Sequence, residues 1–306
     1  MAHTAPSIST QPLSPERAAS PHVRAPAGPV APSADPVQLC FPGLDADECR
    51  AAQAAAEVLG AAAARKVGGF VLPIGFRLSV LMPVYNERET VVQIIERVRS
   101  LPVPMELIVV DDGSTDGTRQ LLEQMPRREG VKVMYHERNR GKGAALRTAL
   151  TMATGDVAVI QDADLEYDPQ ECLRLLEPIV AGRADVVFGS RYLADDGTRR
   201  KCPGQSPAHR LANRLLTWLS NVFTGLRLSD METCYKMFRR SALAGVQIEQ
   251  DRFGVEPELT AKIARRGCRL IEMPIAYTAR DKSQGKKIRL RDAFNAVWCI
   301  VRYSCL

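Results

Sequence analysis

Short apolar runs alternate with segments of helical periodicity from Arg77 to Gly189, and this alternation limits the possible folds more than any other feature of the chain. The apolar runs are typical of buried strands and cover residues 78–82, 107–110, 131–136, 157–160 and 185–189. Helices are predicted between them, over residues 89–100, 115–124, 141–152 and 169–181. Because alternating strands and helices form right-handed βαβ units, we predict an α/β fold with a mainly parallel sheet flanked by helices.

The alternation ends after Gly189. We predict a helix over residues 209–224, a strand over 235–238, a helix over 256–266 and a strand over 268–277. A polar loop over 282–289 leads to a terminal amphipathic helix over 292–303. The folded domain is therefore expected to span residues 77–303, in two halves of 77–190 and 191–303.

The region before this domain has a different composition. Residues 1–40 are dominated by Pro, Ala and Ser, and such a segment cannot bury enough apolar surface to fold. We predict a disordered tail there. A helical extension is expected over residues 41–76, with an Ala-rich helix at 45–66.

The chain lacks signals for export or membrane insertion. Its 306 residues contain no apolar run of the about 18 residues that a spanning helix requires, and its N-terminus does not resemble a secretory signal. None of the eight cysteines forms a C-x-x-C pair. Because unpaired cysteines are typical of a reducing compartment, we predict a cytoplasmic location.

Four acids follow the strand predicted at 157–160, namely Asp162, Asp164, Glu166 and Asp168. Open α/β sheets bind ligands at the carboxyl ends of their strands. Two carboxylates one residue apart, such as Asp162 and Asp164, can share a Mg²⁺ or Mn²⁺ ion that grips a diphosphate. The alternative from the residues alone is a solvated acidic turn.

Polar side chains also follow two other predicted strands, with Tyr85 and Glu87 after the first and Asp112 after the second. These strand ends are expected to meet the acidic loop at one crevice. An aromatic ring that stacks and carboxylates that accept hydrogen bonds suit a nucleoside. The sequence Gly141-Lys142-Gly143 fits either a phosphate cradle or a plain turn before a helix.

Most of the net charge of +6 lies near the C-terminus. Residues 280–302 contain seven basic side chains and two acidic ones. Such a stretch can meet phosphates, anionic lipid or nucleic acid, or form a solvated helix face. A nucleic-acid partner is not expected, because it would leave the acidic strand ends without a role.

Five sequence motifs together resemble family 2 glycosyltransferases of the nucleotide-sugar-binding type A fold. They are SVLMPVYNERETV, IVVDDGSTDGT, NRGKGAAL, GDVAVIQDADLEYDP and DVVFGSRY, and the likeness covers about residues 77–303. The chain is most similar to the dolichol-phosphate mannose and glucose synthases and their bacterial polyprenyl-phosphate relatives. These motifs do not specify the sugar, the base or the oligomeric state.

The resemblance assigns donor-side roles to residues at the strand ends. It implies a metal, Mg²⁺ or Mn²⁺, held by Asp162 and Asp164, with Glu166 as a third oxygen ligand where related synthases often carry Gln. Asp168 is expected to cap the following helix instead. The residues implied for the nucleotide sugar are Pro83, Tyr85, Glu87, Val110, Asp112, Lys142, Asp162, Ala163 and Asp164.

The acceptor side is assigned in the same way. Arg191, Arg280 and Lys286 match phosphate-binding positions of the family, and Asp230 matches an acid near the acceptor. The alternatives are ion pairing of Arg191 with Asp195 or Asp196 and, for Lys286, a solvated loop. Glu232 is a candidate base for a hydroxyl acceptor, and Glu258 is either a family acid or part of a buried structural pair.

The resemblance thus implies a metal-dependent inverting transferase with Asp162, Asp164, Arg191 and Asp230 as catalytic residues. The donor would be a nucleotide diphosphate sugar of the UDP-glucose or GDP-mannose type, and the acceptor a polyprenyl or dolichyl phosphate. Two alternatives stay open, namely a soluble hydroxyl acceptor and a non-catalytic nucleotide-sugar-binding protein. The terminal helix, with Phe294 and Trp298, either lies on the inner face of the membrane or packs on the domain.

Overall fold

The computed structural model describes residues 38–44, 47–48, 51–52, 54, 69–202, 204–280 and 290–305. These described residues all belong to one compact unit. Most of the predicted tail, much of the helix predicted at 45–66 and the loop at 282–289 with Lys286 lie outside the described residues. A short antiparallel pair, β1 (Leu39–Cys40) and β2 (Phe70–Val71), precedes the main domain.

A seven-stranded sheet forms the centre of the domain, in the order β5-β4-β3-β6-β8-β7-β9. Its strands are β3 (Leu78–Val84), β4 (Met105–Asp111), β5 (Val131–Tyr135), β6 (Val157–Ile160), β7 (Val186–Ser190), β8 (Lys236–Arg239) and β9 (Leu270–Pro274). Only β8 runs antiparallel to its neighbours in this sheet, β6 and β7. The prediction of a mainly parallel α/β sheet is therefore confirmed.

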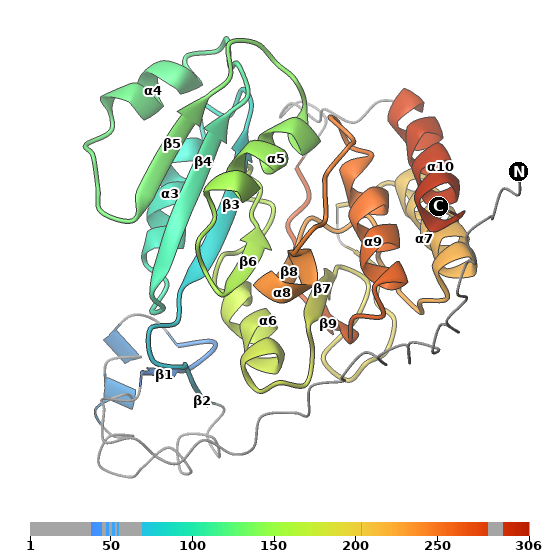
Figure 1. The fold of residues 1–306 in the computed structure, drawn as a ribbon, viewed down its shortest axis with the longest axis horizontal. Coiled ribbons are helices and arrows are strands. Elements are labelled where there is room, and N and C mark those ends of the chain that lie inside the picture. Colours follow the sequence, from blue (N-terminus) through green and yellow to red (C-terminus); the bar gives the residue numbers. More distant parts are fainter. Residues whose placement is uncertain are drawn as a thin grey trace, which may run out of the picture. The chain divides into compact units, whose positions relative to one another are not determined.

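Helices cover both faces of the sheet (Figure 1). The connections between β3, β4 and β5 are α3 (Val91–Arg99) and α4 (Thr118–Gln124), which contact each other on one face. On the other face, α5 (Lys142–Met152) packs against β3 and β4. After β6, α6 (Glu171–Val180) packs against β7 and β8.

The remaining long helices form a group of their own. They are α7 (Pro207–Thr224), α9 (Val255–Arg265) and α10 (Leu290–Cys305), and each contacts the other two. A single short turn, α8 (Arg240–Leu243), follows β8. Within the described residues, no helix combines the length and apolar character needed to cross a bilayer.

Strand β3 is longer than predicted, since it continues through Pro83 to Val84 instead of ending before the proline. Its pairing with β6 ends at Leu81 and Ile160, whereas its pairing with β4 continues to Val84 and Asp111. Proline lacks an N–H donor, and β6 has already ended beside position 83. The strand therefore carries the proline at no cost in hydrogen bonds.

One buried carboxylate joins the strands at their amino ends. Glu106 of β4 accepts hydrogen bonds from Ser79 Oγ (2.7 Å), Lys132 Nζ (2.8 Å) and the backbone of Thr154 (2.5 Å) and Gly155 (3.1 Å). Burial alone would raise the pKa of Glu106, but the bonds from Lys132, Ser79 and Thr154 outweigh it and lower the pKa to about 2. This carboxylate is therefore a structural anchor at the end of the sheet opposite the predicted site.

Candidate active site

The loops after β3, β4 and β6 meet as predicted, and backbone geometry shapes two of them. In the described part of the chain, the only non-glycine residues with positive φ are Asn86 (51°) and Leu165 (60°). Asn86 accepts a hydrogen bond from Thr115 N (2.8 Å) and donates its own N–H to Ser114 Oγ (2.9 Å), so the loops after β3 and β4 are joined. Leu165 turns the loop between Asp164 and Glu166. Strained backbone of this kind concentrates at functional sites.

Lys142 pairs with the first acid of the β6 loop. Its ammonium lies 2.9 Å from Asp162 Oδ1 and 2.8 Å from Glu256 Oε1. Burial lowers the pKa of Lys142, but the negative charges around it, with Asp162 the largest, raise that pKa well above its usual value. The lysine is therefore a permanent cation beside Asp162.

Arg280 joins three more carboxylates. Its guanidinium lies 3.0 Å from Glu87 Oε2, 2.8 Å from Asp164 Oδ2 and 3.7 Å from Glu166 Oε1. Glu166 also accepts from the backbone N–H of Arg280 (2.9 Å). Burial raises the pKa of Asp164 to about 7, aided by the charges of Asp162 and Glu166 and opposed by Arg280. Arg280, which was predicted to bind the acceptor phosphate, thus pairs here with acids that were predicted for the donor.

These acids have the chemistry of a site for a hard divalent ion, although they are paired with cations here. Within the described segments, no group of three or more His, Cys, Asp or Glu side chains is arranged to hold a metal ion. Asp162 and Asp164 nevertheless offer only oxygen ligands, which suit Mg²⁺ or Mn²⁺. Burial first, and then the charges of Asp162 and Glu166, raise the pKa of Asp164, and a bound cation would favour its ionised form. A metal ion at Asp164 would compete with Arg280 for that carboxylate.

Asp168, the fourth acid, was predicted to cap the helix after it, but it lies in the turn before α6, whose N-cap residue is Gln170. Its carboxylate accepts from Gln170 N (3.1 Å) and its carbonyl from Glu171 N (3.1 Å). These bonds satisfy two of the N–H groups that a helix leaves open at its start.

The sequence Gly141-Lys142-Gly143 forms a joint between segments. A Cβ atom at Gly141 would overlap the carbonyl oxygen of Asp251, and one at Gly143 would overlap that of Gln250. The next amide, Ala144 N, donates to Asp251 O (3.1 Å). Because the two glycines have no side chain, the backbone of residues 250–251 can pack directly against them. Lys142, between them, is the residue that pairs with the acidic loop.

Asp112 is engaged inside the protein. Its carboxylate accepts from Gly141 N (2.6 Å) and Arg140 N (3.0 Å), and it lies 2.7 Å from Nδ1 of His136. It thereby fixes the start of α5 relative to β4. The other residues predicted around the nucleotide sugar are half-buried (Pro83 and Tyr85) or buried (Glu87, Val110 and Ala163).

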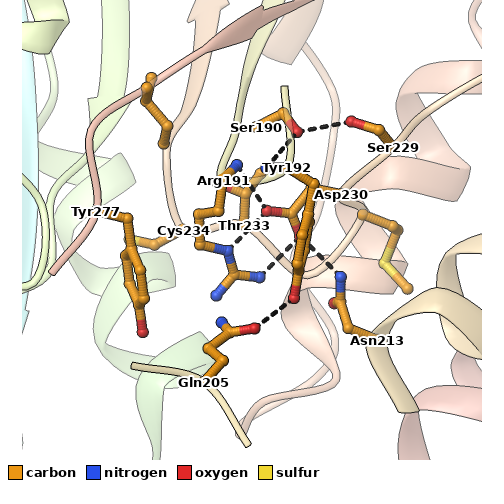
Figure 2. A network of polar contacts seen from close by, with 12 residues as sticks. Ser190, Arg191, Tyr192, Gln205, Asn213, Ser229, Asp230, Thr233, Cys234 and Tyr277 are labelled. Carbon is orange, nitrogen blue, oxygen red and sulfur yellow. Dashed lines mark hydrogen bonds and ion pairs between the residues drawn. The ribbon is translucent and has the colours of Figure 1, made fainter. Parts of the chain in front are cut away.

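On the acceptor side, two predicted residues form one buried ion pair (Figure 2). Arg191 donates from Nε (2.6 Å) and Nη2 (2.7 Å) to the two oxygens of Asp230. The alternative partners are occupied elsewhere, since Asp195 pairs with Arg174 (2.6 Å) and Asp196 accepts from Thr198 (2.6 Å). A bidentate pair of this kind fixes both side chains strongly.

Three residues that the sequence did not indicate support this pair. Asn213 of α7 donates to Asp230 Oδ1 (3.2 Å), and Glu272 of β9 accepts from the backbone N–H of Asp230 (2.9 Å). The ring of Tyr277 lies 5.2 Å from the Arg191 guanidinium, and Figure 2 shows the ring beside it. A lone acid or amide in an amphipathic element carries no local signal of such a role.

Glu232 lies close to this pair, but one of its carboxylate oxygens lacks the hydrogen bonds that the pair has. Burial and the charge of Glu256 raise the pKa of Glu232 to about 7, whereas Lys236 and Arg191 oppose the shift. Its Oε1 is buried and has no hydrogen-bond partner within the described residues. Glu258, in contrast, pairs with Lys262 (2.6 Å) and accepts from Glu249 N (2.7 Å), which confirms the structural alternative for this acid.

Helices α7 and α10 each leave large apolar side chains exposed. Trp218 is 62% exposed on α7 and Phe294 is 73% exposed on α10. The others are Leu211, Leu215, Val222 and Phe223 on α7, and Val297, Trp298 and Val301 on α10. We call these nine side chains the apolar surface. Helices α7 and α10 contact each other, so these side chains lie on neighbouring helices. A contiguous exposed apolar patch is typical of an interaction site.

The family model described as "Glycosyl transferase family 2" matches residues 79–246. The polyprenol monophosphomannose synthase of Mycolicibacterium smegmatis is 31% identical over 225 residues, which are 70% of this chain and 83% of that protein. The undecaprenyl-phosphate 4-deoxy-4-formamido-L-arabinose transferase of Proteus mirabilis is 31% identical over 216 residues, 69% of this chain but only 62% of that protein.

Solved structures share the fold at lower identity. Glucosyl-3-phosphoglycerate synthase from Mycobacterium tuberculosis in complex with uridine diphosphate has a TM-score of 0.59 at 21% identity, over 76% of this chain and 82% of that one. The complex of the same protein with Mn²⁺, uridine diphosphate and phosphoglyceric acid has a TM-score of 0.56 at 20% identity, over 76% of this chain and 79% of that one.

Proposed function

We propose that this chain, which belongs to glycosyltransferase family 2, transfers a hexose from a nucleotide diphosphate sugar of the UDP-glucose or GDP-mannose type to a polyprenyl phosphate. Family membership makes the chain a glycosyltransferase, so the non-catalytic alternative is not retained. Relatives named as transferases acting on polyprenol or undecaprenyl phosphate support the acceptor. The reaction is expected to invert the sugar configuration, because an anionic phosphate can attack directly.

The observation that carries the acceptor assignment is the position of α7. Its outer face belongs to the apolar surface, with Trp218 and Leu215, while its buried face supplies Asn213 to the Arg191–Asp230 pair. A helix is about 10 Å thick, so a phosphate group at the lipid interface and the buried guanidinium are separated by little more than one helix. We therefore place the protein at the cytoplasmic face of a membrane, as a peripheral protein.

The charges of α7 fit the same placement. The helix contains no acid, and Arg214 on it is exposed without an acidic partner among the residues that the structure describes. On α10, the guanidinium of Arg302 stacks at 5.1 Å over the ring of Trp298. Basic and aromatic side chains beside an apolar face are typical of helices that lie at an anionic bilayer surface.

Two guanidinium groups have suitable chemistry for the acceptor phosphate. Arg191 uses Nε and Nη2 for Asp230, whereas its Nη1 has no hydrogen-bond partner in the described part of the chain. Asp230 thus orients Arg191 with donors left for a phosphate. Arg280 would become available if a metal ion at the donor site took over its carboxylate partners. Lys286 is retained as a proposed third cation.

The donor side is assigned to the acids that Arg280 and Lys142 now neutralise. Asp162 and Asp164 would hold Mg²⁺ or Mn²⁺, with Glu166 as a further oxygen ligand. Such an ion would stabilise the negative charge of the leaving nucleoside diphosphate. Pro83, Tyr85, Glu87, Val110, Asp112 and Ala163 are proposed around the rest of the nucleotide sugar.

Membrane vesicles test the acceptor directly. Radiolabelled UDP-glucose and GDP-mannose are supplied with Mn²⁺ and vesicles that contain undecaprenyl phosphate, and the products are extracted into organic solvent. We expect label in the lipid fraction with one donor. The absence of lipid label with both donors would rule out this function as stated.

Variants of the apolar surface separate membrane docking from catalysis. Trp218→Glu is expected to reduce both vesicle binding and lipid product at least tenfold, with unchanged binding of nucleoside diphosphate. Ile74→Glu is the matched control, because Ile74 is also exposed (68%) but lies outside α7 and α10. Equal effects of the two substitutions would show that the apolar surface has no specific role.

Transfer to a soluble hydroxyl acceptor is the second candidate, and Glu232 favours it. A hydroxyl must lose a proton as it attacks, and a carboxylate with a pKa of about 7 is suited to accept one. A phosphate acceptor needs no such base. Glu232→Gln is therefore expected to leave transfer to lipid phosphate within about threefold of wild type, whereas transfer to a soluble hydroxyl acceptor would fall about 10²-fold or more.

A further inference from the structure

Lys142 is held from two sides, and the residue behind it belongs to no motif identified above. The side chains of Lys142 and Glu256 are only 12% and 9% exposed, and their charged groups lie 2.8 Å apart. On its other side the ammonium meets Asp162 at 2.9 Å. Glu256, Lys142 and Asp162 thus form a line of alternating charge that ends at the donor site.

The backbone around Glu256 is tied closely to α5. Arg147 of α5 donates to Ile248 O (2.6 Å) and Glu249 O (3.1 Å) and pairs with Asp251 (2.8 Å). Together with the joint at Gly141 and Gly143, these bonds connect α5 to the segment that leads into α9. Lys142 begins α5 and Glu256 lies in the first turn of α9, so both belong to this connected unit.

Glu256 is not optimised for stability. Its Oε2 is buried and has no hydrogen-bond partner within the described residues. A buried carboxylate oxygen without a partner costs free energy, and such groups call for a functional explanation. A purely structural acid nearby, Glu258, has both oxygens satisfied by Glu249 N, Gln250 N and Lys262.

We propose that Glu256 is a positioning residue that fixes the Lys142 ammonium beside Asp162, where the ammonium binds the diphosphate of the nucleotide sugar. This inference rests on the proposed function. Diphosphate oxygens compete for the donors of Lys142 that now face Asp162, which frees that carboxylate. Glu256 keeps its own hydrogen bond and prevents the flexible lysine side chain from turning away.

The experiment compares binding of a diphosphate with binding of the nucleoside alone. Titration calorimetry measures UDP, GDP, uridine and guanosine, each with Mn²⁺, on the full chain carrying Glu256→Gln. We expect the affinity for the preferred diphosphate to fall about tenfold or more, with the affinity for its nucleoside within twofold of wild type. An unchanged diphosphate affinity, or an equal loss for the nucleoside, would overturn the proposal.

Glu258→Gln is the matched control. It removes the same charge from the same helical turn, but its partner is Lys262 and not Lys142. We expect a lower melting temperature and unchanged diphosphate affinity. A loss of diphosphate affinity equal to that of Glu256→Gln would show that both act through the fold, and would contradict the proposal.

A double-mutant cycle tests whether Glu256 acts through Lys142. Lys142→Met is expected to weaken diphosphate binding, and adding Glu256→Gln to it is expected to cause no further loss. Additive losses would overturn the proposed route. If Glu256→Gln does not fold, Glu256→Asp replaces it. This variant keeps the negative charge but moves it away from Lys142, and we expect the same selective loss. Full diphosphate affinity in Glu256→Asp would overturn the proposal.

The wild-type chain distinguishes failure of this inference from failure of the proposed function. If wild type binds neither UDP nor GDP, the proposed donor class is wrong and this inference falls with it. If wild type binds one of them and Glu256→Gln binds it equally well, only the positioning role is wrong.

Discussion

The two ends of the sheet each contain a buried carboxylate, and the pKa values of the two are shifted in opposite directions. At the amino ends of the strands, Glu106 has a pKa lowered to about 2, and at the carboxyl ends Asp164 has a pKa raised to about 7. Both side chains are largely removed from solvent, at 3% and 16% exposure. Burial raises the pKa of both carboxylates, so the direction of the net shift depends on how far their neighbours oppose it.

The difference comes from the neighbours. Glu106 accepts from backbone amides, hydroxyls and Lys132, so its charge is satisfied by the folded chain itself. Asp164 accepts one backbone bond, from Glu166 N (3.1 Å), and faces the like charges of Asp162 and Glu166, with Arg280 as the opposing cation. At the amino ends of the strands, the folded chain itself satisfies the carboxylate charge. At the carboxyl ends, like charges still face each other, and a bound cation can stabilise them.

The largest effect is expected from Asp164→Ala on turnover. Loss of one carboxylate from the proposed diphosphate site should lower kcat/KM about 10³-fold, because charge stabilisation there contributes several kcal/mol. Asp168→Asn is the control, since Asp168 belongs to the same loop but accepts a backbone hydrogen bond in the turn before α6. Initial rates with Mn²⁺ measure both, and comparable losses would remove the distinction between the site acid and the turn acid.

Glu106→Gln should mainly affect stability. An amide cannot accept the same set of hydrogen bonds and leaves Lys132 without its carboxylate, so we expect a loss of about 3 kcal/mol in the free energy of unfolding. Urea unfolding at pH 7 measures this loss. Specific activity of the folded fraction should stay within twofold, and a large loss of activity would contradict the separation of the two ends.

Acid should reduce the difference between wild type and Glu106→Gln. The pKa of Glu106 in the folded state, about 2, lies below the ordinary value of 4.5, so the stabilisation is fully present above pH 4.5 and is lost as the pH falls toward 2. We expect the difference in unfolding free energy to be about halved by pH 3. A difference that is constant from pH 7 to pH 3 would show that it does not depend on the charge of Glu106.

The smallest effect should have the opposite sign. Asp164→Asn removes a charge that the folded, metal-free protein disfavours, so we expect stabilisation of about 1 kcal/mol, or roughly 2–4 °C in Tm for a chain of this size. Differential scanning fluorimetry in EDTA at pH 8 measures the shift. A lower Tm would mean that the pairing of Asp164 with Arg280 contributes more than the crowding costs.

The sequence was sufficient for the parts of the fold that depend on local pattern. Residues 157–160 were predicted as a strand and form β6 with the same bounds. The meeting of the loops after β3, β4 and β6 followed from the rule for parallel sheets. Helix α7 was predicted as well, over residues 209–224. The observed helix begins two residues earlier, at Pro207, and Ser206 is its N-cap.

The partners of the site residues were not accessible in the same way. Glu87 and Arg280 are 193 residues apart in the chain, and Lys142 and Glu256 are also distant. No periodicity or motif encodes such contacts, because they depend on how separate elements pack. Glu106 was missed for a related reason, since an acid beside an apolar run looks solvated until the neighbouring strands are placed.

The joint at Gly141 and Gly143 has a consequence for how related sequences can vary. Both glycines meet backbone carbonyls, of Asp251 and Gln250, and a carbonyl is present whatever side chain occupies those positions. No substitution at 250 or 251 can therefore compensate for a side chain at 141 or 143. In an alignment, the two glycines should be invariant and show no covariation with the residues they touch, so contact prediction from covariation would miss the joint.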